Sequence, residues 1–451
     1  MFTRSGKTWT KALSLLLAAF LLLALAAGCS AKTAASDTGS PEAAVSEDSQ
    51  QAASGDAEEF ATAEGVTPEP GAKLKIWGPD PANGNDSSGQ WLQDMAKEFE
   101  EKYGVPFVFE PINATDSPGK LAQDGPAKQG ADVFFMAHDH LGEVVAAGLV
   151  YPNEATDASQ FLESAITACS SEGKLYGYPT AIETYGLFYN KKLIDKAPAT
   201  YQEIIDFAKT FNDVKNKKFG LMIEPDNFYF SYQYLAGYGG YVFGKDGTDP
   251  DDIGLNNEGA IEGAKFLQSL KEILPVNSGD ITGDVRDGLF KEGKLAMQVS
   301  GPWSVQPYTE AGVEFGVTPL PLLPNGKNPV SFSGVRALYI NSYTDYPVAS
   351  RMFAEYCVTK ESLVKLYKTA GHIPPRKDLM EDPDLKADPY TTAFLQQAQY
   401  SQPMPSIPQM GAVWAQGKTA LASIWNNNTD PRETLDNAVK LIKETAVQTT
   451  K

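Results

Sequence analysis

An alternation of strand and helix patterns over residues 73–137 constrains the fold of this chain most strongly. Residues 73–77 form a short apolar run, and residues 91–103 carry apolar side chains at helical spacing. Two further apolar runs follow at residues 105–110 and 131–137, the second apolar enough to be buried on both faces. Strand, helix, strand in this order needs a crossover connection, so the sequence predicts an α/β fold around a parallel sheet.

The same alternation continues along the chain. Thr200 and Glu203 have the spacing of a capping box, which predicts a helix over residues 200–211. The proline-rich residues 319–329 are predicted to cross between two lobes, and a length of 451 residues allows two to three domains. Further predicted elements are a strand at 219–223, a helix at 259–273 and a strand at 334–341.

The N-terminal residues have the pattern of a targeting segment. Three basic residues precede an apolar run at residues 12–27, which is typical of a signal peptide, although the run is also as long as the shortest membrane-spanning helices. Residues 25–30, LAAGCS, resemble a bacterial lipobox, with Ala26 where such boxes more often carry a branched apolar residue. We therefore predict a signal peptide over residues 1–28 and acylation of Cys29. Acyl chains on Cys29 would anchor the protein to the outer face of the cell membrane as an extracytoplasmic lipoprotein.

Residues 29–70 are predicted to form a disordered tether. They contain few large apolar side chains, and one lysine stands against nine acidic residues. Such a segment cannot bury enough apolar surface to offset the entropy of ordering. The fold is therefore expected to begin near residue 71.

Charge and cysteine content exclude several classes of partner. A formal net charge of -19 argues against binding to nucleic acid, because phosphate contacts need clustered lysine and arginine. Three cysteines without C-x-x-C spacing predict neither a disulfide framework nor a zinc site, and Cys169 and Cys357 are expected to be free thiols. His138, Asp139 and His140 are adjacent, but hydrogen bonding is the favoured role for the two histidines over metal ligation.

Sequence motifs of enzymes are absent or incomplete. H-E-x-x-H, G-x-S-x-G and a strand-linked G-x-G-x-x-G do not occur, and the Gly417-Lys418-Thr419 triplet lacks the earlier glycine of a phosphate loop because position 412 is alanine. No metal, cofactor or catalytic activity is therefore predicted. A surface glycoside hydrolase stays an alternative, since 57 acidic residues could place two carboxylates at the required separation.

An aromatic cluster at residues 228–241 is the strongest candidate for a binding surface. Seven of its fourteen residues are phenylalanine or tyrosine, so a helix here would present rings on every side. Aromatic faces pack well against the C–H faces of sugar rings, but an aromatic core helix is the alternative. Trp303 and Trp414 both follow Gly/Pro turns, where a large ring more often lines a cleft, and this favours a binding role.

Several short stretches, in order, resemble the maltose/maltodextrin-binding proteins, the extracellular solute receptors of ABC importers. The resemblance runs from about residue 73 to the C-terminus and includes residues 73–77, 132–139, 177–183, 187–191, 239–241, 301–303 and 407–410. It implies a two-lobed periplasmic-binding-protein-like fold of type II, with a hinge between two α/β lobes that each have a sheet flanked by helices. The implied lobes are N-terminal, from residues 71–181 and 319–373, and C-terminal, from residues 182–318 and 374–451.

The resemblance also implies a set of substrate-binding residues. Asp139 and Glu183 lie where the family places carboxylates that accept hydrogen bonds from sugar hydroxyls, a role for which an ionised carboxylate is well suited. His140, Met136 and Asn227 depart from residues that some members carry at these positions, so the preferred sugar and linkage stay open. The implied substrate-binding residues are Asp80, Lys120, Asp139, His140, Glu183, Tyr229, Phe230, Trp303 and Trp414.

Taken together, these features predict a monomeric receptor that binds maltodextrin between its lobes and docks on the membrane permease of an ABC transporter. Lobe closure over the ligand is expected to need no chemistry. A receptor for another oligosaccharide or for a cationic solute such as a polyamine is an alternative, because aromatic boxes bind cations as well.

Overall fold

The structure, a computed structural model, describes residues 66–82 and 86–449. The predicted signal peptide, Cys29 and most of the predicted tether lie outside these residues. None of the helices in the described ranges is both long and apolar enough to cross a membrane. The last residues of the predicted tether are described, and the Glu69 carboxylate accepts hydrogen bonds from the backbone N–H groups of Val348 and Ala349 at distances of 2.6 and 2.9 Å. Ordered contacts therefore begin before residue 71.

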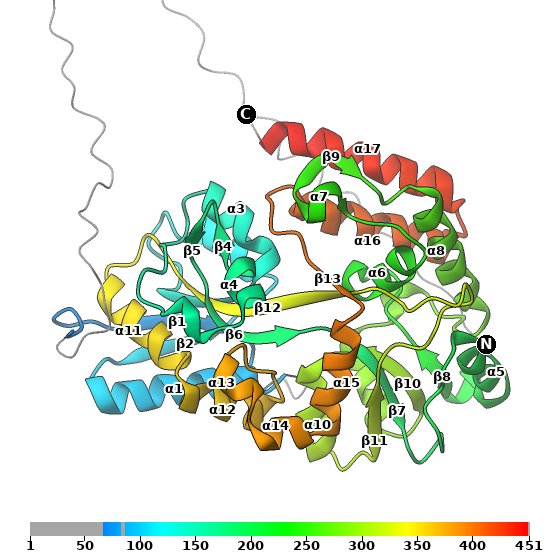
Figure 1. The fold of residues 1–451 in the computed structure, drawn as a ribbon, viewed down its shortest axis with the longest axis horizontal. Helices are drawn as coiled ribbons and strands as arrows, with labels where there is room; N and C mark the ends of the chain where they lie inside the picture. Colours follow the sequence, from blue (N-terminus) through cyan, green and yellow to red (C-terminus); the bar gives the residue numbers. More distant parts are fainter. Residues whose placement is uncertain (1–65, 83–85, 450–451) are drawn as a thin grey trace, which may run out of the picture. The chain divides into compact units, whose positions relative to one another are not determined.

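The larger of the sheets in the described residues has six strands and forms the N-terminal lobe (Figure 1). β1 pairs in parallel with β2 and β3, as the strand and helix alternation predicts, and β12 is antiparallel to β3 and β6. β13 extends the sheet by pairing in parallel with the start of β12. The strands are β1 (Leu74–Gly78), β2 (Phe107–Pro111), β3 (Val133–Ala137), β6 (Tyr178–Glu183), β12 (Ser331–Ile340) and β13 (Ser401–Pro403).

Helices cover this sheet on both faces. Alternate residues of the strands point to opposite sides, so that Ile76 and Val133 lie in one core while Trp77 and Phe134 lie in the other. Cys169 and Cys357 are buried in these cores as free thiols, which confirms the expectation for both. The flanking helices are α1 (Ser88–Tyr103), α2 (Ser117–Asp124), α3 (Leu141–Ala146), α4 (Glu163–Ala168), α11 (Pro347–Cys357), α12 (Lys360–Ala370) and α13 (Lys377–Met380).

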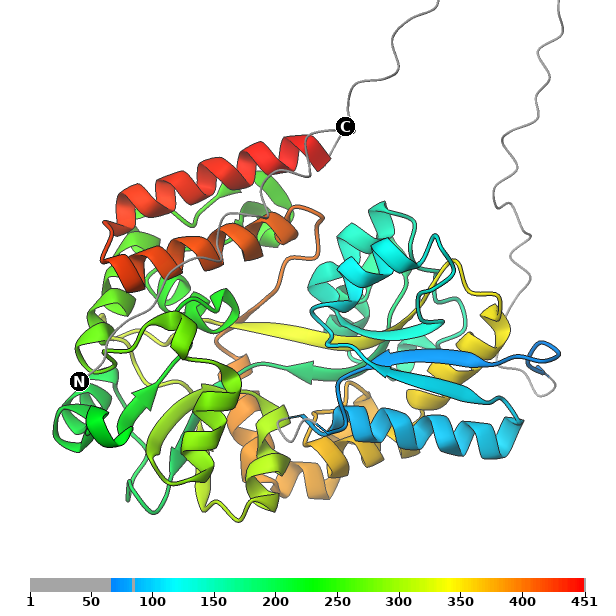
Figure 2. The same ribbon diagram turned by 180° about the vertical axis from the view of Figure 1, so that it is seen from behind.

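A second sheet forms the C-terminal lobe, with four strands in the order β11-β7-β10-β8 among the described residues. It shares one large core with its helices (Figure 2). The strands are β7 (Gly186–Asn190), β8 (Phe219–Met222), β10 (Leu295–Ser300) and β11 (Phe315–Thr318). The helices are α5 (Tyr201–Phe211), α6 (Phe228–Gly237), α8 (Glu258–Ser269), α9 (Gly283–Lys291), α10 (Val305–Glu310), α15 (Pro389–Ala398), α16 (Met410–Asn427) and α17 (Pro431–Thr449). Smaller elements are the β4–β5 hairpin (Ser170–Ser171, Lys174–Leu175), α7 (Gly244–Gly247), β9 (Asp249–Ile253) and α14 (Pro383–Ala387).

Three segments connect the lobes. The first runs from β6 to β7, and the second is β12. The prediction that the proline-rich residues 319–329 cross between the lobes is wrong, because Leu320 and Leu323 pack in the core of the C-terminal lobe. β12 itself begins with Phe332 in the core of the C-terminal lobe and ends with Leu338 in a core of the N-terminal lobe. The third connection follows α12, where Ile373 bridges to Ile182 of β6 and Leu379 still packs in the N-terminal lobe.

Differences from the predicted elements have local causes. β12 begins three residues before the predicted strand, because residues 331–333 pair with β13, a partner that no local pattern reveals. Thr200 caps α5 as predicted, whereas the Glu203 carboxylate accepts from the Ala199 N–H instead of from the cap residue. The predicted helix at residues 259–273 ends as α8 at Ser269 and continues as a 3₁₀ turn.

Candidate ligand-binding site

Polar and aromatic side chains gather where strands of the two sheets end. Asp139 lies in the 3₁₀ turn His138–His140 directly after β3, and Glu183 is the last residue of β6. Trp303 lies in the turn Pro302–Ser304 after β10, and Tyr229 lies in the first turn of α6 after β8. Strand ends in α/β sheets are the usual position of ligand sites.

Arg336 of β12 is the centre of this group. Its Nε lies 2.7 Å from Glu183 Oε2, and its Nη1 lies 2.7 Å from Asp86 Oδ2. Its guanidinium carbon lies 5.0 Å from the centroid of the Trp303 ring. Arg336, Asp86, Glu183, Trp303 and Tyr229 are called the Arg336 cluster below.

Sequence reasoning missed Arg336 and Asp86. A signal for Arg336 existed, because it is the only charged residue in the apolar stretch 334–341. Asp86 precedes α1 and its Oδ1 accepts from the Ser88 N–H at 2.9 Å, an ordinary helix-start contact that gives no hint of the distant arginine.

Electrostatics keep Asp86 and Arg336 ionised. Burial alone would raise the pKa of Asp86, but the Arg336 guanidinium and then the His372 ring hold it well below its usual range. His372 Nε2 lies 3.3 Å from Asp86 Oδ1. Burial likewise works against the charge of Arg336, and Glu183 and Asp86 together raise its pKa. The Asp86 carboxylate and the Arg336 guanidinium therefore stay charged at neutral pH.

Tyr229 brings a hydroxyl into the same region. Its ring contacts Tyr185 and Phe230, with centroids 5.0 and 5.2 Å away. Burial raises the pKa of Tyr229 well above its usual value, with a further contribution from the Glu183 charge. Within the described residues, the buried Tyr229 hydroxyl has no hydrogen-bond partner. An unpaired buried hydroxyl of this kind points to a water or a ligand.

Asp139 and Trp414 join the two lobes. The Trp414 Nε1–H in α16 donates a hydrogen bond to Asp139 Oδ2 at 2.9 Å. His140 is held beside them, with its Nε2 3.5 Å from Asp139 Oδ2 and its Nδ1 3.0 Å from Glu143 Oε1. Burial would lower the pKa of His140, but Asp139 and Glu143 together raise it.

His138 serves the backbone and not a metal. Its Nδ1 accepts from the Val335 N–H at 3.1 Å, so its Nε2–H donates to the Met404 carbonyl at 3.0 Å. Burial lowers the pKa of His138, which keeps the ring neutral. No group of three or more His, Cys, Asp or Glu side chains in the described ranges has a geometry that could hold a metal ion.

Lys120 and Asp80 have different surroundings. The Lys120 Nζ lies 2.6 Å from Asp124 Oδ2 and 5.2 Å from the centroid of the Trp77 ring. Asp80 is exposed, and its carboxylate accepts from the Ala82 N–H. Lys120 thus lies between α2 and β1, and Asp80 lies in the turn that follows β1.

The aromatic cluster divides between core and site. Phe228, Phe230, Tyr232 and Tyr234 are at most 7% exposed and pack in the core of the C-terminal lobe, as the alternative of an aromatic core helix predicts. Phe230 lies with its centroid 5.3 Å from the Tyr185 ring, behind Tyr229. Tyr229 is the residue of α6 that reaches the Arg336 cluster.

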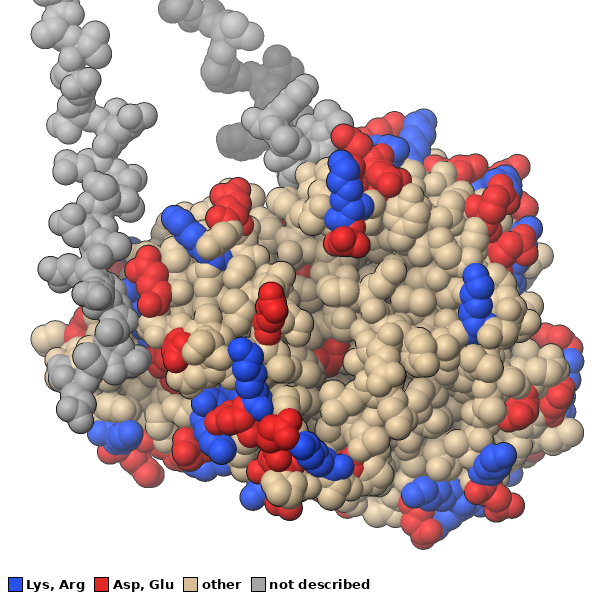
Figure 3. Space-filling view, viewed as in Figure 1, with Lys and Arg blue, Asp and Glu red and all other residues tan. Residues whose placement is uncertain are grey.

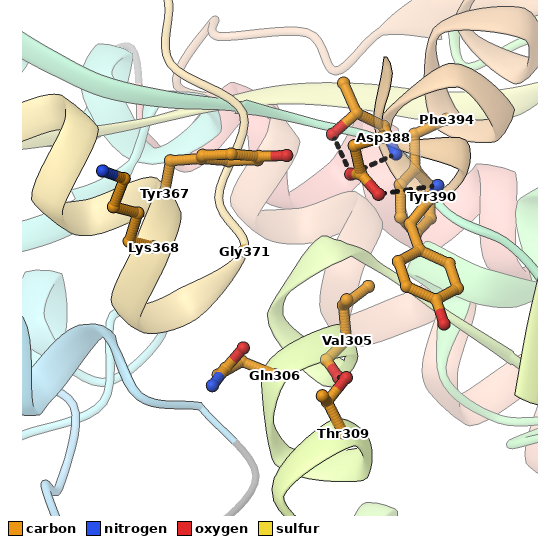
Figure 4. A pocket seen from close by; sticks show the side chains of 10 residues that line it. Val305, Gln306, Thr309, Tyr367, Lys368, Gly371, Asp388, Tyr390 and Phe394 are labelled. Carbon is orange, nitrogen blue, oxygen red and sulfur yellow. Dashed lines mark hydrogen bonds between the residues drawn. The ribbon is translucent and has the colours of Figure 1, made fainter. Parts of the chain in front are cut away.

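Two cavities lie at contacts between the lobes. One, of about 240 Å³, is lined by residues of β6, β12, α4 and α15, and Figure 3 shows a hollow in the middle of the face where β12, β13 and α15 meet. The other, of about 270 Å³, lies between α10, α12 and α15. Figure 4 shows Tyr367 of α12 across this space from Val305 and Gln306 of α10, with Tyr390 at its side.

Comparison with known proteins supports the resemblance. Residues 94–393 match the family described as bacterial extracellular solute-binding protein. A galactooligosaccharide-binding protein of Bacillus subtilis is 33% identical over 83% of this chain and 89% of its own length. A maltooligosaccharide ABC transporter solute-binding lipoprotein of Streptococcus pneumoniae is 33% identical over 79% of this chain and 86% of its own length.

A solved structure extends the comparison to the fold. The structure of MalX from Streptococcus pneumoniae in complex with maltopentaose has a TM-score of 0.75 and 31% identity, and the match covers 82% of this chain and all of that chain. The two-lobed α/β architecture, with a sheet in each lobe, is thus the fold of maltodextrin-binding proteins of known structure. This chain belongs to the bacterial extracellular solute-binding proteins.

Proposed function

We propose that this protein is the extracellular receptor of an ABC importer and binds α-1,4-linked glucan oligosaccharides between its lobes. The observation that carries the proposal is the Arg336 cluster, where two carboxylates, an arginine, the Tyr229 hydroxyl without a partner in the described residues and the Trp303 indole lie together, with groups from both lobes. Maltopentaose is bound in the related MalX structure, which supports the choice of sugar class.

The groups in this region match the chemistry of a neutral sugar. Carboxylates accept hydrogen bonds from hydroxyls, and the neutral Tyr229 hydroxyl can donate or accept. Indole faces pack on the apolar faces of sugar rings. We assign direct contact with the sugar to Asp139, Glu183, Tyr229, Trp303 and Trp414.

The remaining predicted residues have supporting roles in this proposal. His140 orients Asp139 through the 3.5 Å contact between their side chains, and the buried Phe230 supports the Tyr229 ring from behind. Lys120 and Asp80 lie near β1 and would contact only the outer units of a longer chain.

Delivery and location complete the proposal. Members of this family bind solutes, which supports capture without catalysis followed by docking on a membrane permease. A related protein is named as a lipoprotein, which supports acylation at Cys29 and attachment to the outer face of the cell membrane. We propose that the anchored protein acts as a monomer.

A second candidate ligand is a galactooligosaccharide. The 33% identical relative from Bacillus subtilis is named as binding this class, so overall similarity does not separate the two sugars. Galactose differs from glucose in the orientation of one hydroxyl, and a site with fixed acceptors distinguishes the two by leaving a polar group unpaired.

Isothermal titration calorimetry of the protein with maltotriose, maltotetraose, a cyclodextrin, β-1,4-galactotriose and spermidine tests the proposal. We expect saturable binding of the glucans, at least about tenfold tighter than of galactotriose, since one mispaired buried hydroxyl costs about 1 to 3 kcal/mol. Trp303→Ala and Trp414→Ala should weaken that binding. Each mixture is then analysed for shorter sugars.

The other outcomes point to other functions. Preferential binding of galactotriose would replace the glucan assignment with the second candidate. Binding of spermidine alone would indicate a receptor for cations, and release of glucose at a catalytic rate would show a hydrolase.

A further inference from the structure

We infer that Arg336 is a positioning residue of the sugar site, which fixes the Glu183 and Asp86 carboxylates and the Trp303 ring before the ligand arrives. This inference rests on the proposed function, because it assigns the residue that organises the same site. No sequence motif contains Arg336 or Asp86, and only their side-chain contacts connect them to the site.

The three contacts of Arg336 come from different parts of the molecule. Asp86 precedes α1 in the N-terminal lobe, Glu183 ends β6 at the first connection between the lobes, and Trp303 follows β10 in the C-terminal lobe. Arg336 itself lies on β12, which passes from one core to the other. One guanidinium therefore touches both lobes and two of the segments that connect them.

Burial makes these contacts hard to replace with water. The side chains of Arg336, Asp86 and Glu183 are 14%, 17% and 7% exposed. Two carboxylates this close to one another and this buried would repel each other without the cation between them. Arg336 neutralises both through separate nitrogens, so each carboxylate keeps one orientation.

That arrangement leaves Glu183 prepared for a hydroxyl. Arg336 Nε lies 2.7 Å from Oε2, yet this buried oxygen accepts no hydrogen bond within the described residues, so the ion pair orients the carboxylate and leaves it able to accept from a ligand. A group that is already oriented loses less conformational entropy on binding, which increases affinity.

Trp303 is fixed from two sides. The guanidinium lies 5.0 Å from the ring centroid, and a Cβ atom at Gly301 would lie 2.2 Å from atoms of the same ring. The ring is thus held between Arg336 and the Gly301 backbone. A sugar can stack only on the part of the Trp303 ring that Arg336 and Gly301 leave uncovered. Arg336 therefore helps to determine where the sugar lies.

The test compares Arg336→Gln with Arg376→Gln in the full chain, titrated with maltotriose by calorimetry. Arg376 is a matched control, because it also pairs with an aspartate, at 3.0 Å from Asp378, and lies over an aromatic ring, 5.5 Å from the Phe161 centroid. We expect Arg336→Gln to weaken maltotriose binding about 30-fold and Arg376→Gln to change it less than about twofold. Arg336→Lys keeps the positive charge but cannot bind the two carboxylates through separate nitrogens, so it should recover only part of the lost affinity.

A double-mutant cycle separates positioning from a general structural effect. If Arg336 acts through Glu183, the variant with both Arg336→Gln and Glu183→Gln should bind only slightly more weakly than the weaker single variant. If the two losses multiply, Arg336 acts independently of Glu183 and the positioning role is wrong.

Two further outcomes are decisive. Equal binding by the unmodified protein and Arg336→Gln overturns the inference while the proposed function stands, whereas an unmodified protein that binds no oligosaccharide overturns both.

Should Arg336→Gln fail to fold, Asp86→Asn removes one of the two carboxylates that Arg336 binds and leaves the arginine in place. We then expect Asp86→Asn, which lowers the midpoint of thermal unfolding but is titrated well below it, to weaken binding about fivefold, and unchanged affinity would contradict the role.

Discussion

Two arginines with nearly the same chemistry, Arg286 fully buried and Arg336 mostly buried, have different settings in this molecule. Arg286 in α9 pairs with Glu224 at 2.7 Å and with Asp287 at 3.5 Å, and lies 5.3 Å from the Phe230 centroid. Arg336 likewise has two carboxylates and one aromatic ring. Each cation is thus balanced by two acids and covered by one ring.

The difference lies in where the partners come from. Arg286 and its partners all belong to the C-terminal lobe, and the Arg286 Nη1–H also donates to the Val299 carbonyl at 3.0 Å. Tyr308 extends this network by donating to Asp287 and accepting from Gln298. Arg336 instead joins segments of both lobes and lies among groups that are still unpaired. We therefore expect the ion pairs of Arg286 to stabilise one lobe and those of Arg336 to prepare a site for a ligand.

The largest expected effect is on stability, from Arg286→Gln. Removing one partner leaves buried carboxylates without compensation, so we expect the free energy of unfolding to fall by about 3 to 5 kcal/mol. Urea denaturation followed by tryptophan fluorescence measures the loss. A loss no larger than that expected for an exposed ion pair, such as Arg432 with Glu258, would show that Arg286 does not stabilise its lobe.

Gly301→Ala should act on the ligand site and not on the fold. The added Cβ would lie 2.2 Å from Trp303 ring atoms and push the ring away from Arg336, so we expect maltotriose binding to weaken about tenfold. Gly283→Ala near Arg286 is the matched control, because its Cβ would meet only Glu224 Oε1 at 3.8 Å. Calorimetry on both variants checks the contrast, and equal affinities would contradict it.

Replacing single hydrogen-bond donors should separate the two networks further. Trp414→Phe removes the donor to Asp139 across the lobes, and we expect about three- to tenfold weaker sugar binding with little change in stability. Tyr308→Phe removes the donor to Asp287 and should lower the free energy of unfolding by about 1 to 2 kcal/mol with binding unchanged. The reverse pattern would assign the two networks to the opposite roles.

The smallest expected effect is a pH dependence from His140. Its folded-state pKa is raised, so its contribution to stability is complete below the unfolded pKa of about 6.5 and is lost as the pH rises through the folded pKa. The free energy of unfolding, measured from pH 5.5 to 8, should include a loss on the order of 1 kcal/mol or less from this group. His140→Gln should remove that part, and an identical profile for the variant would show that the contacts with Asp139 and Glu143 have no such effect.

Local patterns predicted most of the fold but not the contacts that hold the site together. The β1, β2 and β3 strands and the α5 cap follow from apolar spacing and helix-start residues, which act within a few positions. The position of β12 between β3 and β6 depends on pairing with distant strands, and no local pattern shows it. Lobe boundaries stay predictions.

The same limit explains the site residues. Asp139, Glu183, Trp303 and Trp414 were predicted through a family resemblance, and the structure brings Glu183 to Arg336 and Asp139 to Trp414. Asp86 and Arg336 escaped notice because their importance arises from contacts between segments far apart in the chain. Phe230 belongs to the aromatic cluster that was predicted to bind the ligand, but its ring is buried in the core of the C-terminal lobe.

The place of β12 in its sheet has a consequence for biogenesis. Arg336 pairs with Ala137 on one side and Ala181 on the other, so the strand that joins β3 to β6 is synthesised only after every strand of the other sheet. A chain exported N-terminus first would present an incomplete sheet edge until β12 emerges. The segments of the C-terminal lobe up to β11 emerge before this strand. We therefore expect secretion chaperones to be most important for the N-terminal half, although it leaves the membrane first.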